Sequence, residues 1–581
     1  MEKHWFKQYP LGIPEEIDPD KFKNVPEILD EAVERFGDQT AYIHRIKDFE
    51  RKLTFRELDK YSRDFASYLQ NFTQLEPGDK LAIQMPNLLQ YPIVLFGALR
   101  AGLTVVNTNP LYTHREMEHQ FVDADAKGLV ILDMFQDKLP QVLPKTGIKT
   151  LIIASVGDMF KFPYNFLINN INRFLNQAVP FVEFTQPWVT FQEVMKVGSR
   201  VPFEPMELEP DSLAFLQYTG GTTGVSKGAM LTHRNIVANV EQIASFLGPF
   251  LEDGKERVVT PLPLYHVFAL TCNCLAFVKF GGSNLLITNP RDMDEFLRQL
   301  SIYEFTALTG VNTLFSAMMN HEGFENIKKD RLKFSIGGAM ALQSSVVQQW
   351  KEKTGSPLIE GYGLTEASPV VTVNRLDGKA REGTIGLPLP STDVKLVEED
   401  GSEVTELDTR GEIYVKGPQV MQGYYNRPEE TENTLTEDAW LRTGDIAVWK
   451  EDYFLKIVDR KKDMILVSGF NVYPNEVEDV IASFPGVLEV ACIGVPDPKS
   501  TEAVKAIYRV KPGESVDEAA LRKYAEENLT GYKRPKYYEL RHEELPKSNV
   551  GKILRRVLRE EEDQAHENQA SGEQTEAAAA H

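Results

Sequence analysis

The spacing of hydrophobic positions in the first part of the chain alternates between that of helices and that of buried strands. Apolar residues recur at helical spacing from Leu58 to Leu69, directly after Thr54-Phe-Arg-Glu57, which has the pattern of a capping box. A buried helix is expected from Tyr91 to Ala101. Short apolar runs predict strands at residues 81–85, 104–106, 128–132 and 150–154. Strand, helix and strand in this order predict parallel βαβ units, and therefore an α/β fold.

A charged break late in the chain predicts a domain boundary. Arg460, Lys461 and Lys462 lie between two apolar segments, and the residues after them have the pattern of a smaller α+β domain. We therefore expect a large N-terminal domain at residues 1–459 and a small C-terminal domain at residues 460–559. Residues 560–581 are acidic and rich in alanine with no apolar pattern, which predicts a disordered tail.

A basic amphipathic segment follows the predicted strands, at residues 160–184. Its apolar stripe consists of Tyr164, Leu167, Ile168, Ile171 and Leu175, and a neighbouring face carries asparagines. Residues 159–182 contain Lys161 and Arg173 but no acidic side chain. Two interpretations stay open. The segment packs on the core as an ordinary helix, or it lies on an anionic membrane or covers a lipid tunnel.

The charge balance and the cysteines narrow the class of protein. The 64 basic and 85 acidic side chains give a net charge of −21, which argues against a nucleic-acid-binding protein and favours a soluble one. The three cysteines, Cys272, Cys274 and Cys492, fit neither a zinc site nor a disulfide framework. The N-terminal residues lack an apolar signal core, and no run reaches the roughly 18 apolar residues that span a bilayer. We expect a cytoplasmic protein, with peripheral contact to the inner face of the membrane left open.

A loop rich in glycine and hydroxyl groups, Tyr218-Thr-Gly-Gly-Thr-Thr-Gly-Val-Ser-Lys-Gly228, follows the apolar run at residues 213–216 and offers groups that bind phosphate. Its glycines allow positive φ and can turn backbone N–H groups toward one point. Its hydroxyls and Lys227 add hydrogen bonds and a positive charge. The Walker pattern is excluded because Lys227 follows Ser226 and precedes Gly228. A flexible surface loop is the alternative.

Three further segments carry groups suited to a nucleotide. Residues 335–340 predict a strand that ends in a tight glycine turn, where the backbone can approach a flat ring. Gly361-Tyr-Gly-Leu-Thr-Glu366 combines an aromatic ring that can cover adenine, a hydroxyl for a phosphate and a carboxylate for Mg²⁺. Asp445 follows a turn and can accept two ribose hydroxyls. Each segment alone also fits an ordinary turn.

Together these segments resemble the signature sequences of the adenylate-forming superfamily, the acyl-CoA synthetases and their relatives. The similarity keeps the same order from about residue 50 to residue 556 and is strongest with bacterial long-chain fatty acyl-CoA ligases. It depends most on Leu216-Gln-Tyr-Thr-Gly-Gly-Thr-Thr-Gly224, Met230-Leu-Thr-His-Arg-Asn235 and Val458-Asp-Arg-Lys-Lys-Asp-Met-Ile-Leu-Val-Ser-Gly-Phe-Asn-Val-Tyr-Pro474. The resemblance implies a large N-terminal domain of several subdomains with βα-layered sheets, and a small mobile α+β domain at the C-terminus.

The resemblance also implies a role for each candidate residue. The ATP-binding residues are Thr219, Gly220, Gly221, Thr222, Thr223, Gly224, Lys227, Gly338, Ala339, Met340, Gly361, Tyr362, Gly363, Asp445 and Arg460. Lys552 and Thr365 contact the α-phosphate, His266 places the carboxylate or gates its channel, and Glu366 holds Mg²⁺. Lys462 is the hinge, and Gly469 faces the coenzyme A channel. Without the resemblance, a lone histidine among apolar neighbours and a lysine in a surface loop are ordinary structural residues.

The implied reaction has two steps with ATP and coenzyme A as substrates and Mg²⁺ as cofactor. A fatty carboxylate attacks the α-phosphate to give acyl-AMP and pyrophosphate, and the coenzyme A thiol then displaces AMP. One alternative is a ligase for medium-chain or aryl acids. Another is a nucleotide- and lipid-binding protein without turnover, which is disfavoured because Lys552 and Glu366 are both present. A homodimer is left open.

Overall fold

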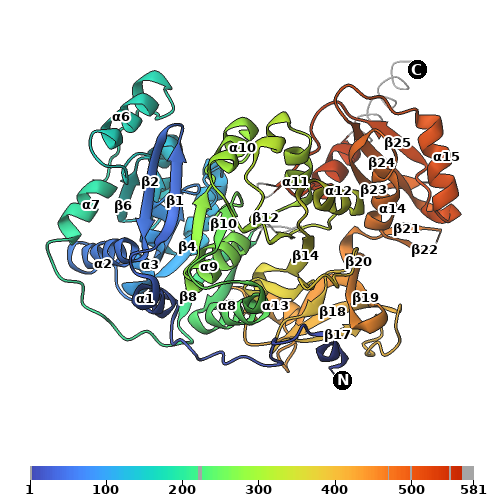
Figure 1. The fold of residues 1–581 in the computed structure, drawn as a ribbon, viewed down its shortest axis with the longest axis horizontal. Helices are drawn as coiled ribbons and strands as arrows, with labels where there is room; N and C mark the ends of the chain where they lie inside the picture. Colours follow the sequence, from blue (N-terminus) through green and yellow to red (C-terminus); the bar gives the residue numbers. More distant parts are fainter. Residues whose placement is uncertain (1–2, 220–225, 469, 498–499, 549–550, 565–581) are drawn as a thin grey trace, which may run out of the picture.

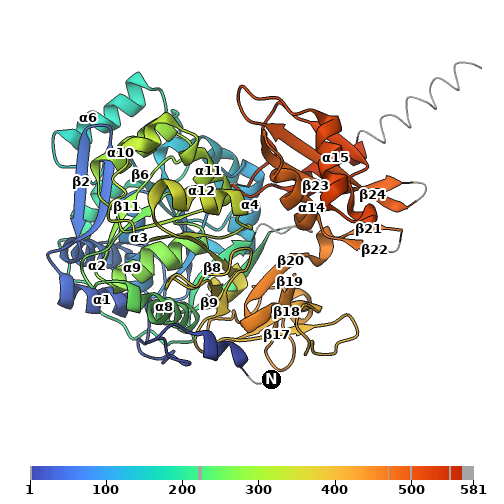
Figure 2. The same cartoon turned by 45° about the vertical axis from the view of Figure 1, so that its right-hand side comes forward.

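The computed structural model describes residues 3–219, 226–468, 470–497, 500–548 and 551–564. In these residues the strands form four β-sheets (Figure 1). Three sheets belong to a large N-terminal domain and the fourth to a small C-terminal domain, which Figure 2 shows as a separate lobe. The α/β fold class is confirmed. The prediction of a disordered tail from residue 560 is wrong for residues 560–564, which continue a helix that begins at residue 555 and in which Glu562 pairs with Lys505. Positions 565–581 lie outside the described residues.

The seven-stranded sheet contains the predicted βαβ units. Its order is β7 (Val189–Thr190), β6 (Thr150–Ala154), β5 (Ala126–Leu132), β3 (Lys80–Gln84), β4 (Thr104–Asn107), β8 (Leu213–Thr219) and β9 (Lys227–Thr232). All neighbours are parallel except β8 and β9, which pair antiparallel and carry the glycine-rich loop between them. The predicted strands are confirmed.

Three helices around this sheet follow from local sequence. The capping box at Thr54 begins α2 (Phe55–Phe72), where the amide of Glu57 donates to Oγ1 of Thr54 at 3.1 Å. A second capping box begins α4 (His114–Asp123). The apolar helix α3 (Gln90–Arg100) is buried along its whole length, as expected for a helix that is hydrophobic on every side. α5 (Leu139–Val142) and α7 (Phe191–Gly198) complete this part of the domain.

The nine-stranded sheet packs against the same interior helices. Its order is β16 (Leu387–Pro388), β15 (Val370–Val373), β14 (Leu358–Gly363), β13 (Phe334–Gly337), β12 (Ala307–Gly310), β10 (Arg257–Thr260), β11 (Ser283–Leu286), β1 (Thr40–Ile46) and β2 (Phe49–Thr54). Its helices are α1 (Val25–Phe36), α8 (His233–Leu247), α9 (Ala276–Lys279), α10 (Met293–Ile302), α11 (Asn312–Met319) and α12 (Ser344–Thr354). One buried cluster joins α1, α3 and α8 to both large sheets, so the two sheets share a core.

The chain leaves the N-terminal domain through a four-stranded antiparallel sheet. Its strands are β17 (Asp393–Val397), β18 (Arg410–Lys416), β19 (Leu441–Trp449) and β20 (Leu455–Arg460), and the short helix α13 (Pro428–Thr434) precedes β19. β20 ends at Arg460, and the next strand already belongs to the C-terminal sheet. The change of sheet therefore falls in the charged break at residues 461–464.

The C-terminal domain is a small α+β unit. Its strands are β21 (Ile465–Val467), β22 (Phe470–Val472), β23 (Val487–Asp497), β24 (Thr501–Val510) and β25 (Tyr537–Leu540). Its helices are α14 (Pro474–Ala482) and α15 (Glu518–Asn528), and residues 555–564 are also helical. Cys272, Cys274 and Cys492 are free thiols.

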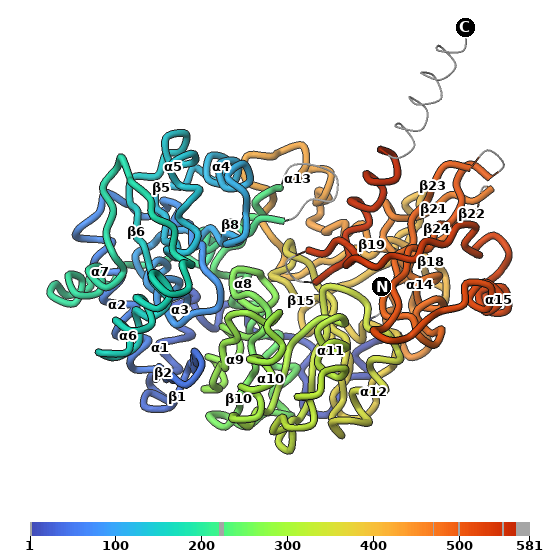
Figure 3. The backbone as a smooth tube through the Cα atoms, turned by 90° about the horizontal axis from the view of Figure 1, so that it is seen from above, coloured from blue at the N-terminus to red at the C-terminus, as the bar shows by residue number. Residues whose placement is uncertain are grey.

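The amphipathic segment lies at the end of the molecule away from the C-terminal domain (Figure 3). It forms α6 (Tyr164–Asn170) and a π-helical turn at Ile171–Leu175. Ile168 is buried, whereas Tyr164, Leu167 and Leu175 are 47%, 43% and 77% exposed. Packing on the core therefore accounts for Ile168 but not for the rest of the apolar stripe. Among the described residues, no helix is long and apolar enough to cross a membrane.

Candidate active site

One large cavity, of about 2590 Å³, lies between the two domains and is lined by residues of both. The predicted site residues that line it are Thr219, Lys227, His266, Gly338, Ala339, Met340, Gly361, Tyr362, Gly363, Thr365, Glu366, Asp445, Arg460, Lys462 and Lys552. The remaining predicted residues, Gly220, Gly221, Thr222, Thr223, Gly224 and Gly469, lie outside the described residues. The structure thus brings together every predicted site residue that it describes.

The glycine turn after β13 lies beside the end of β14. The amide of Gly338 donates to the carbonyl oxygen of Gly310 at 3.2 Å, and Ala339 has a φ of +64°. A Cβ atom added at Gly338 would lie 3.0 Å from the ring of Phe268 and 3.3 Å from the carbonyl oxygen of Gly361. The carboxyl ends of neighbouring parallel strands form the usual ligand crevice of α/β sheets, so these backbone segments are well placed to hold a flat ring.

A bulge at the end of β14 directs Tyr362 toward the four-stranded sheet. The register between β14 and β15 shifts at Tyr362 and Gly363. A Cβ atom added at Gly363 would lie 2.1 Å from the carbonyl oxygen of Pro369, so glycine is required there. The Tyr362 hydroxyl donates to Oδ2 of Asp445 at 2.6 Å. Burial, followed by the negative charge of Asp445, raises the pKa of Tyr362 well above its usual value, so the phenol keeps its proton.

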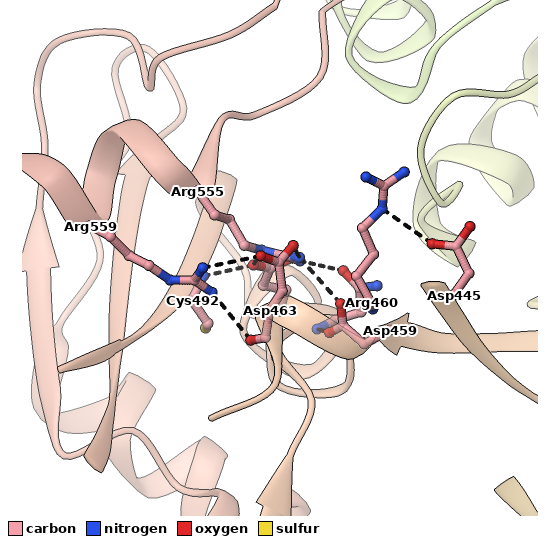
Figure 4. Close-up of polar contacts among 9 residues, drawn as sticks. Asp445, Asp459, Arg460, Asp463, Cys492, Arg555 and Arg559 are labelled. Carbon is pink, nitrogen blue, oxygen red and sulfur yellow. Dashed lines mark hydrogen bonds and ion pairs between the residues drawn. The ribbon is translucent and has the colours of Figure 1, made fainter. Parts of the chain in front are cut away.

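Asp445 is held from two sides. Nε of Arg460 lies 3.2 Å from Oδ1 of Asp445, whereas Tyr362 contacts the other carboxylate oxygen, Oδ2. Figure 4 shows the Arg460 and Asp445 side chains pointing toward each other. The amide of Asp445 donates to the hydroxyl of Thr443 at 3.1 Å. A buried carboxylate with two fixed donors is an oriented acceptor, as a site for two ribose hydroxyls requires.

Glu366 has a partner that sequence reasoning missed. The Tyr424 hydroxyl donates to Oε1 of Glu366 at 2.6 Å, and Nζ of Lys227 lies 5.3 Å from the centre of the Tyr424 ring. Tyr424 is placed by an antiparallel contact with Ala229 of β9 and by the amide of Met230, which donates to the carbonyl oxygen of Gly423 at 2.9 Å. The only local signal was an aromatic pair directly after a glycine. Tyr424 thus joins the end of the glycine-rich loop to the predicted metal-binding carboxylate.

Lys552 reaches the cavity from the C-terminal domain. Its loop is closed by the amide of Ser548, which donates to the carbonyl oxygen of Lys552 at 2.7 Å. A Cβ atom added at Gly551 would lie 3.0 Å from Oγ1 of Thr313, so this loop contacts the N-terminal domain. Enclosure by protein and then the charge of Arg460 lower the pKa of Lys552 to about 7. The charged form of a lysine in such an environment is stabilised when an anion lies beside it.

The predicted hinge residue has a similar environment. Lys462 lies in the short turn Lys461–Asp463 between β20 and β21. Burial, followed by the positive charge of Arg460, lowers its pKa to about 8. In the described residues, the chain passes from the four-stranded sheet to the C-terminal sheet through this turn, which contains Lys462.

His266 is neutral and oriented. Burial lowers the pKa of His266 to about 4. The amide of Phe268 donates to Nδ1 of His266 at 3.3 Å, so the ring proton belongs on Nε2. The nitrogen Nε2 is then a donor, which suits a group that positions a carboxylate. The side chain lines the cavity next to Tyr265 and Val267.

An apolar wall of the same cavity was not singled out from the sequence. It consists of Ile243, Phe246, Leu247, Cys272, Phe277, Ala307, Phe334, Ile336 and Val373. These residues come from α8, the π-helical turn Ala269–Leu275, α9 and strands of the nine-stranded sheet, so only the tertiary fold brings them together. Their side chains offer a hydrophobic surface within the cavity that also contains His266 and Lys552.

The described residues contain no group of three or more His, Cys, Asp and Glu side chains able to hold a metal ion by themselves. Glu366 therefore provides a single carboxylate, oriented by Tyr424. Mg²⁺ is commonly bound by one or two carboxylates together with substrate phosphates and water, so a one-carboxylate site fits Mg²⁺ delivered with a nucleotide.

Comparisons with known proteins show the family of this chain. The family model described as AMP-binding enzyme matches residues 29–425, and that of the AMP-binding enzyme C-terminal domain matches residues 476–552. The chain is 50% identical to a long-chain-fatty-acid–CoA ligase of Escherichia coli O157:H7 over 561 residues, covering 97% of this chain and 98% of the relative. It is 39% identical to the protein of the same name from Bacillus subtilis, covering 97% and 99% of the two chains.

Two solved structures show the same fold. One is an anthranilate CoA ligase in complex with anthranoyl-AMP, with a TM-score of 0.83 and 22% identity over 95% of this chain and all of the other. The other is ATP-bound MatB from Rhodopseudomonas palustris, with a TM-score of 0.78 and 26% identity over 92% of this chain and 98% of the other. The two-domain arrangement of this chain is therefore that of adenylate-forming enzymes.

Proposed function

The chain belongs to the AMP-binding enzyme family, and from that premise we propose that it is a long-chain fatty-acid–CoA ligase that forms AMP. The observation that carries this proposal is one cavity that joins a lysine of the C-terminal domain, an oriented Asp445–Arg460 pair, an oriented Glu366 and an apolar wall. The near-full-length relatives named long-chain-fatty-acid–CoA ligase support the choice of acid.

In the first step, a fatty carboxylate oxygen attacks the α-phosphorus of ATP while the bond to the pyrophosphate oxygen breaks. The substrate is the nucleophile, so the protein's task is positioning and charge neutralisation. We assign Lys552 and Thr365 to the α-phosphate, and the loop from Thr219 to Lys227 to the departing pyrophosphate. His266, with Nε2 as donor, orients the carboxylate. Charge that develops on phosphate oxygens is stabilised by fixed donors in a site that excludes water.

The nucleotide is recognised by residues at the ends of β13 and β14 and by Asp445 and Arg460. The backbone at Gly338, Ala339 and Met340 and the end of β14 at Gly361, Tyr362 and Gly363 face the same cavity and hold adenine. Asp445 and Arg460 fix the ribose. Glu366, oriented by Tyr424, would hold Mg²⁺, which would supply positive charge to the phosphates.

In the second step, the thiol of coenzyme A attacks the acyl carbon, the bond to the AMP oxygen breaks, and a thioester forms. Lys552 serves only the first step, so we propose that the C-terminal domain rotates about Lys462 between the steps. Gly469 then faces the pantetheine arm. With the predicted domain boundary between residues 459 and 460, Lys462 belongs to the moving domain.

The apolar wall supports a long-chain acid over the alternatives. Burial of each methylene contributes about 0.8 kcal/mol, so a chain of about fourteen methylenes gains roughly 11 kcal/mol before the costs of binding. Medium-chain and aryl acids would leave part of that surface unused. A ligase for such acids remains the alternative enzyme, and a binding protein without turnover is the alternative from another class.

Release of AMP across a series of fatty acids, with and without coenzyme A, tests this function. We expect release that depends on coenzyme A and is fastest with long chains. Faster turnover of medium-chain or aryl acids would establish the alternative ligase, and absence of AMP with every acid would establish a binding protein. As a test of the lysine assignment, Lys552→Ala should lose acid-dependent pyrophosphate exchange yet retain thioester formation from supplied acyl-adenylate. Equal loss of both steps would contradict the assignment.

We also propose that the protein contacts membranes peripherally through an apolar surface around α6, here called the α6 patch. It consists of Phe162, Phe166, Phe174, Leu175 and Phe181, which are 63–90% exposed. Lys161 and Arg173 lie among them and are exposed, and residues 159–182 contain no acid although the whole chain carries a net charge of −21. Large contiguous apolar surfaces with basic flanks suit an anionic bilayer.

Vesicle flotation tests the α6 patch. The double variant Phe166→Glu, Phe174→Glu should float less with anionic vesicles than the wild type does, whereas Leu11→Glu, Leu111→Glu places the same charge on exposed leucines outside the patch and should float as the wild type does. Ile168 is unsuitable for substitution because it is buried. Equal flotation of the two double variants would contradict the proposal.

A further inference from the structure

Arg555, three residues after Lys552, is the centre of a cluster of ion pairs beneath the hinge (Figure 4). Its guanidinium makes a bidentate contact with Glu478, from Nε to Oε1 at 2.9 Å and from Nη2 to Oε2 at 2.6 Å. Nη2 also donates to Oδ1 of Asn475. Nη1 lies 3.4 Å from Asp459 and 3.4 Å from Asp463. Arg555 therefore has four partners.

Asp459 differs from the other partners of Arg555 in its position relative to the hinge. It is the one that precedes Lys462, on β20 of the N-terminal domain, whereas Asp463, Asn475 and Glu478 follow Lys462. The Asp459 side chain has no exposed surface. Its Oδ2 accepts a hydrogen bond of 2.7 Å from the amide of Asn475, in the first turn of α14. A rotation about Lys462 changes the position of Asp459 relative to both Asn475 and Arg555.

The lengths of these contacts divide them into two kinds. The bidentate Arg555–Glu478 contact is short and charge-assisted, so it keeps Arg555 fixed within the C-terminal domain. The Arg555–Asp459 contact, at 3.4 Å, is near the long limit of a hydrogen bond, so it is easier to separate and form again. The one contact that joins Arg555 to the N-terminal domain is thus weaker than its anchor.

Asp459 is also tied to the nucleotide site through the backbone. Arg460 follows it on β20, and adjacent residues of a strand point to opposite faces. Nε of Arg460 lies 3.2 Å from Asp445, while the amide of Arg460 donates to Oδ1 of Asp459 at 2.7 Å. One face of this strand end therefore reaches the proposed ribose site, and the other reaches the C-terminal domain.

We propose that Asp459 is a positioning residue for the first half-reaction: with Arg555 and the amide of Asn475 it forms a latch that holds the C-terminal domain with Lys552 in the cavity. This inference rests on the proposed two-step function. The latch opens when the domain rotates for the second step. Glu478 and Asp463 move with Arg555 and are not part of the latch.

Separate assays of the two half-reactions in the full chain test the latch. Asp459→Asn should slow acyl-adenylate formation by about tenfold, the usual effect of losing a contact to a charged group, and should not slow thioester formation from supplied acyl-adenylate. Asp459→Glu, which keeps the charge, should recover part of the first rate. Asp463→Asn is the matched control, because Asp463 lies at the same 3.4 Å from Nη1 of Arg555 but on the moving side. It should leave the ratio of the two rates unchanged.

Equal slowing of both half-reactions by Asp459→Asn, or the same change of ratio in Asp463→Asn, would overturn the latch. If Asp459→Asn does not fold, Arg555→Gln removes the same contact from the other side, together with those to Glu478, Asn475 and Asp463, and the same change of ratio is expected. Acyl-adenylate formation by the wild type tests the proposed function separately from the latch. A wild type that forms no acyl-adenylate from any acid would overturn the proposed function itself, whereas an active wild type with unchanged ratios in the variants would overturn only the latch.

Discussion

The hydroxyl of Tyr362 donates a 2.6 Å hydrogen bond to Asp445, 83 residues further along the chain. The bulge of β14 that requires Gly363 is what directs the ring to this carboxylate. Tyr362 was assigned to adenine, and this contact gives it a second task, because it orients the acceptor proposed for the ribose. One side chain thereby links the proposed adenine site to the proposed ribose site.

Substitution Tyr362→Phe keeps the ring and removes this hydrogen bond. A hydrogen bond to a charged group contributes about 1.5–3 kcal/mol, so we expect KM for ATP to rise about tenfold or more while kcat changes little. Steady-state kinetics with saturating acid and coenzyme A measure both constants. Tyr42→Phe is a suitable control, since its hydroxyl contacts Sγ of Cys274 in the core. A similar rise of KM in both variants would contradict the assignment.

Substitution Tyr424→Phe should change the dependence on Mg²⁺. The Tyr424 hydroxyl orients Glu366 through a 2.6 Å hydrogen bond, and loss of such an outer partner typically weakens metal binding by about 10–100-fold. We expect a higher Mg²⁺ concentration at half-maximal rate and a nearly normal maximal rate. Titration of Mg²⁺ at fixed ATP measures this shift. Tyr425→Phe removes the neighbouring phenol, whose ring lies near Lys80, and should behave as the wild type does.

Local chemistry accounts for what the sequence could predict. The strands β3, β4, β5 and β6 were recognisable because each is an apolar run bounded by turn residues, and α2 because its capping box is local. The role of Tyr424 was missed because Glu366, its partner, is 58 residues away and only the pairing of residues 423–425 with β9 brings them together. Contacts of this kind depend on the tertiary fold.

The amphipathic segment shows the same limit. Its periodicity predicted an apolar stripe but not what would cover it. The segment is attached through Asn169, which accepts from the amide of Gly157 at 2.7 Å and donates to Asp158 at 3.1 Å. With the segment attached in this way, Ile168 is buried, whereas Tyr164, Leu167 and Leu175 are exposed to solvent. The burial of an apolar stripe depends on residues that are far away in the sequence but close in the fold. The periodicity of the stripe itself contains no information about them.

The first half-reaction should depend on pH through Lys552. In the free site the pKa of Lys552 is lowered to about 7, first by enclosure and then by Arg460. The charged form, which neutralises the α-phosphate, is therefore populated below about pH 7 and lost above it. We expect kcat/KM for pyrophosphate release, which reports on the free enzyme, to fall as the pH rises through this value.

Lys552→Arg provides the control for this pH dependence. Arginine stays charged throughout the range, so the decline near pH 7 should disappear even if the overall rate is lower. A decline at the same pH in the arginine variant would assign the titration to another group.

A disulfide between positions 313 and 551 should trap the first arrangement of the domains. A Cβ atom at Gly551 would lie 3.0 Å from Oγ1 of Thr313, close enough for the geometry of a disulfide, although φ of +81° at this glycine imposes some strain on a cysteine. Oxidised Thr313→Cys, Gly551→Cys should still form acyl-adenylate but lose most of its thioester formation, because the C-terminal domain cannot rotate, and reduction should restore it. Thr313→Cys alone controls for oxidation of Cys272, Cys274 and Cys492. Undiminished thioester formation in the oxidised double variant would show that rotation is not required.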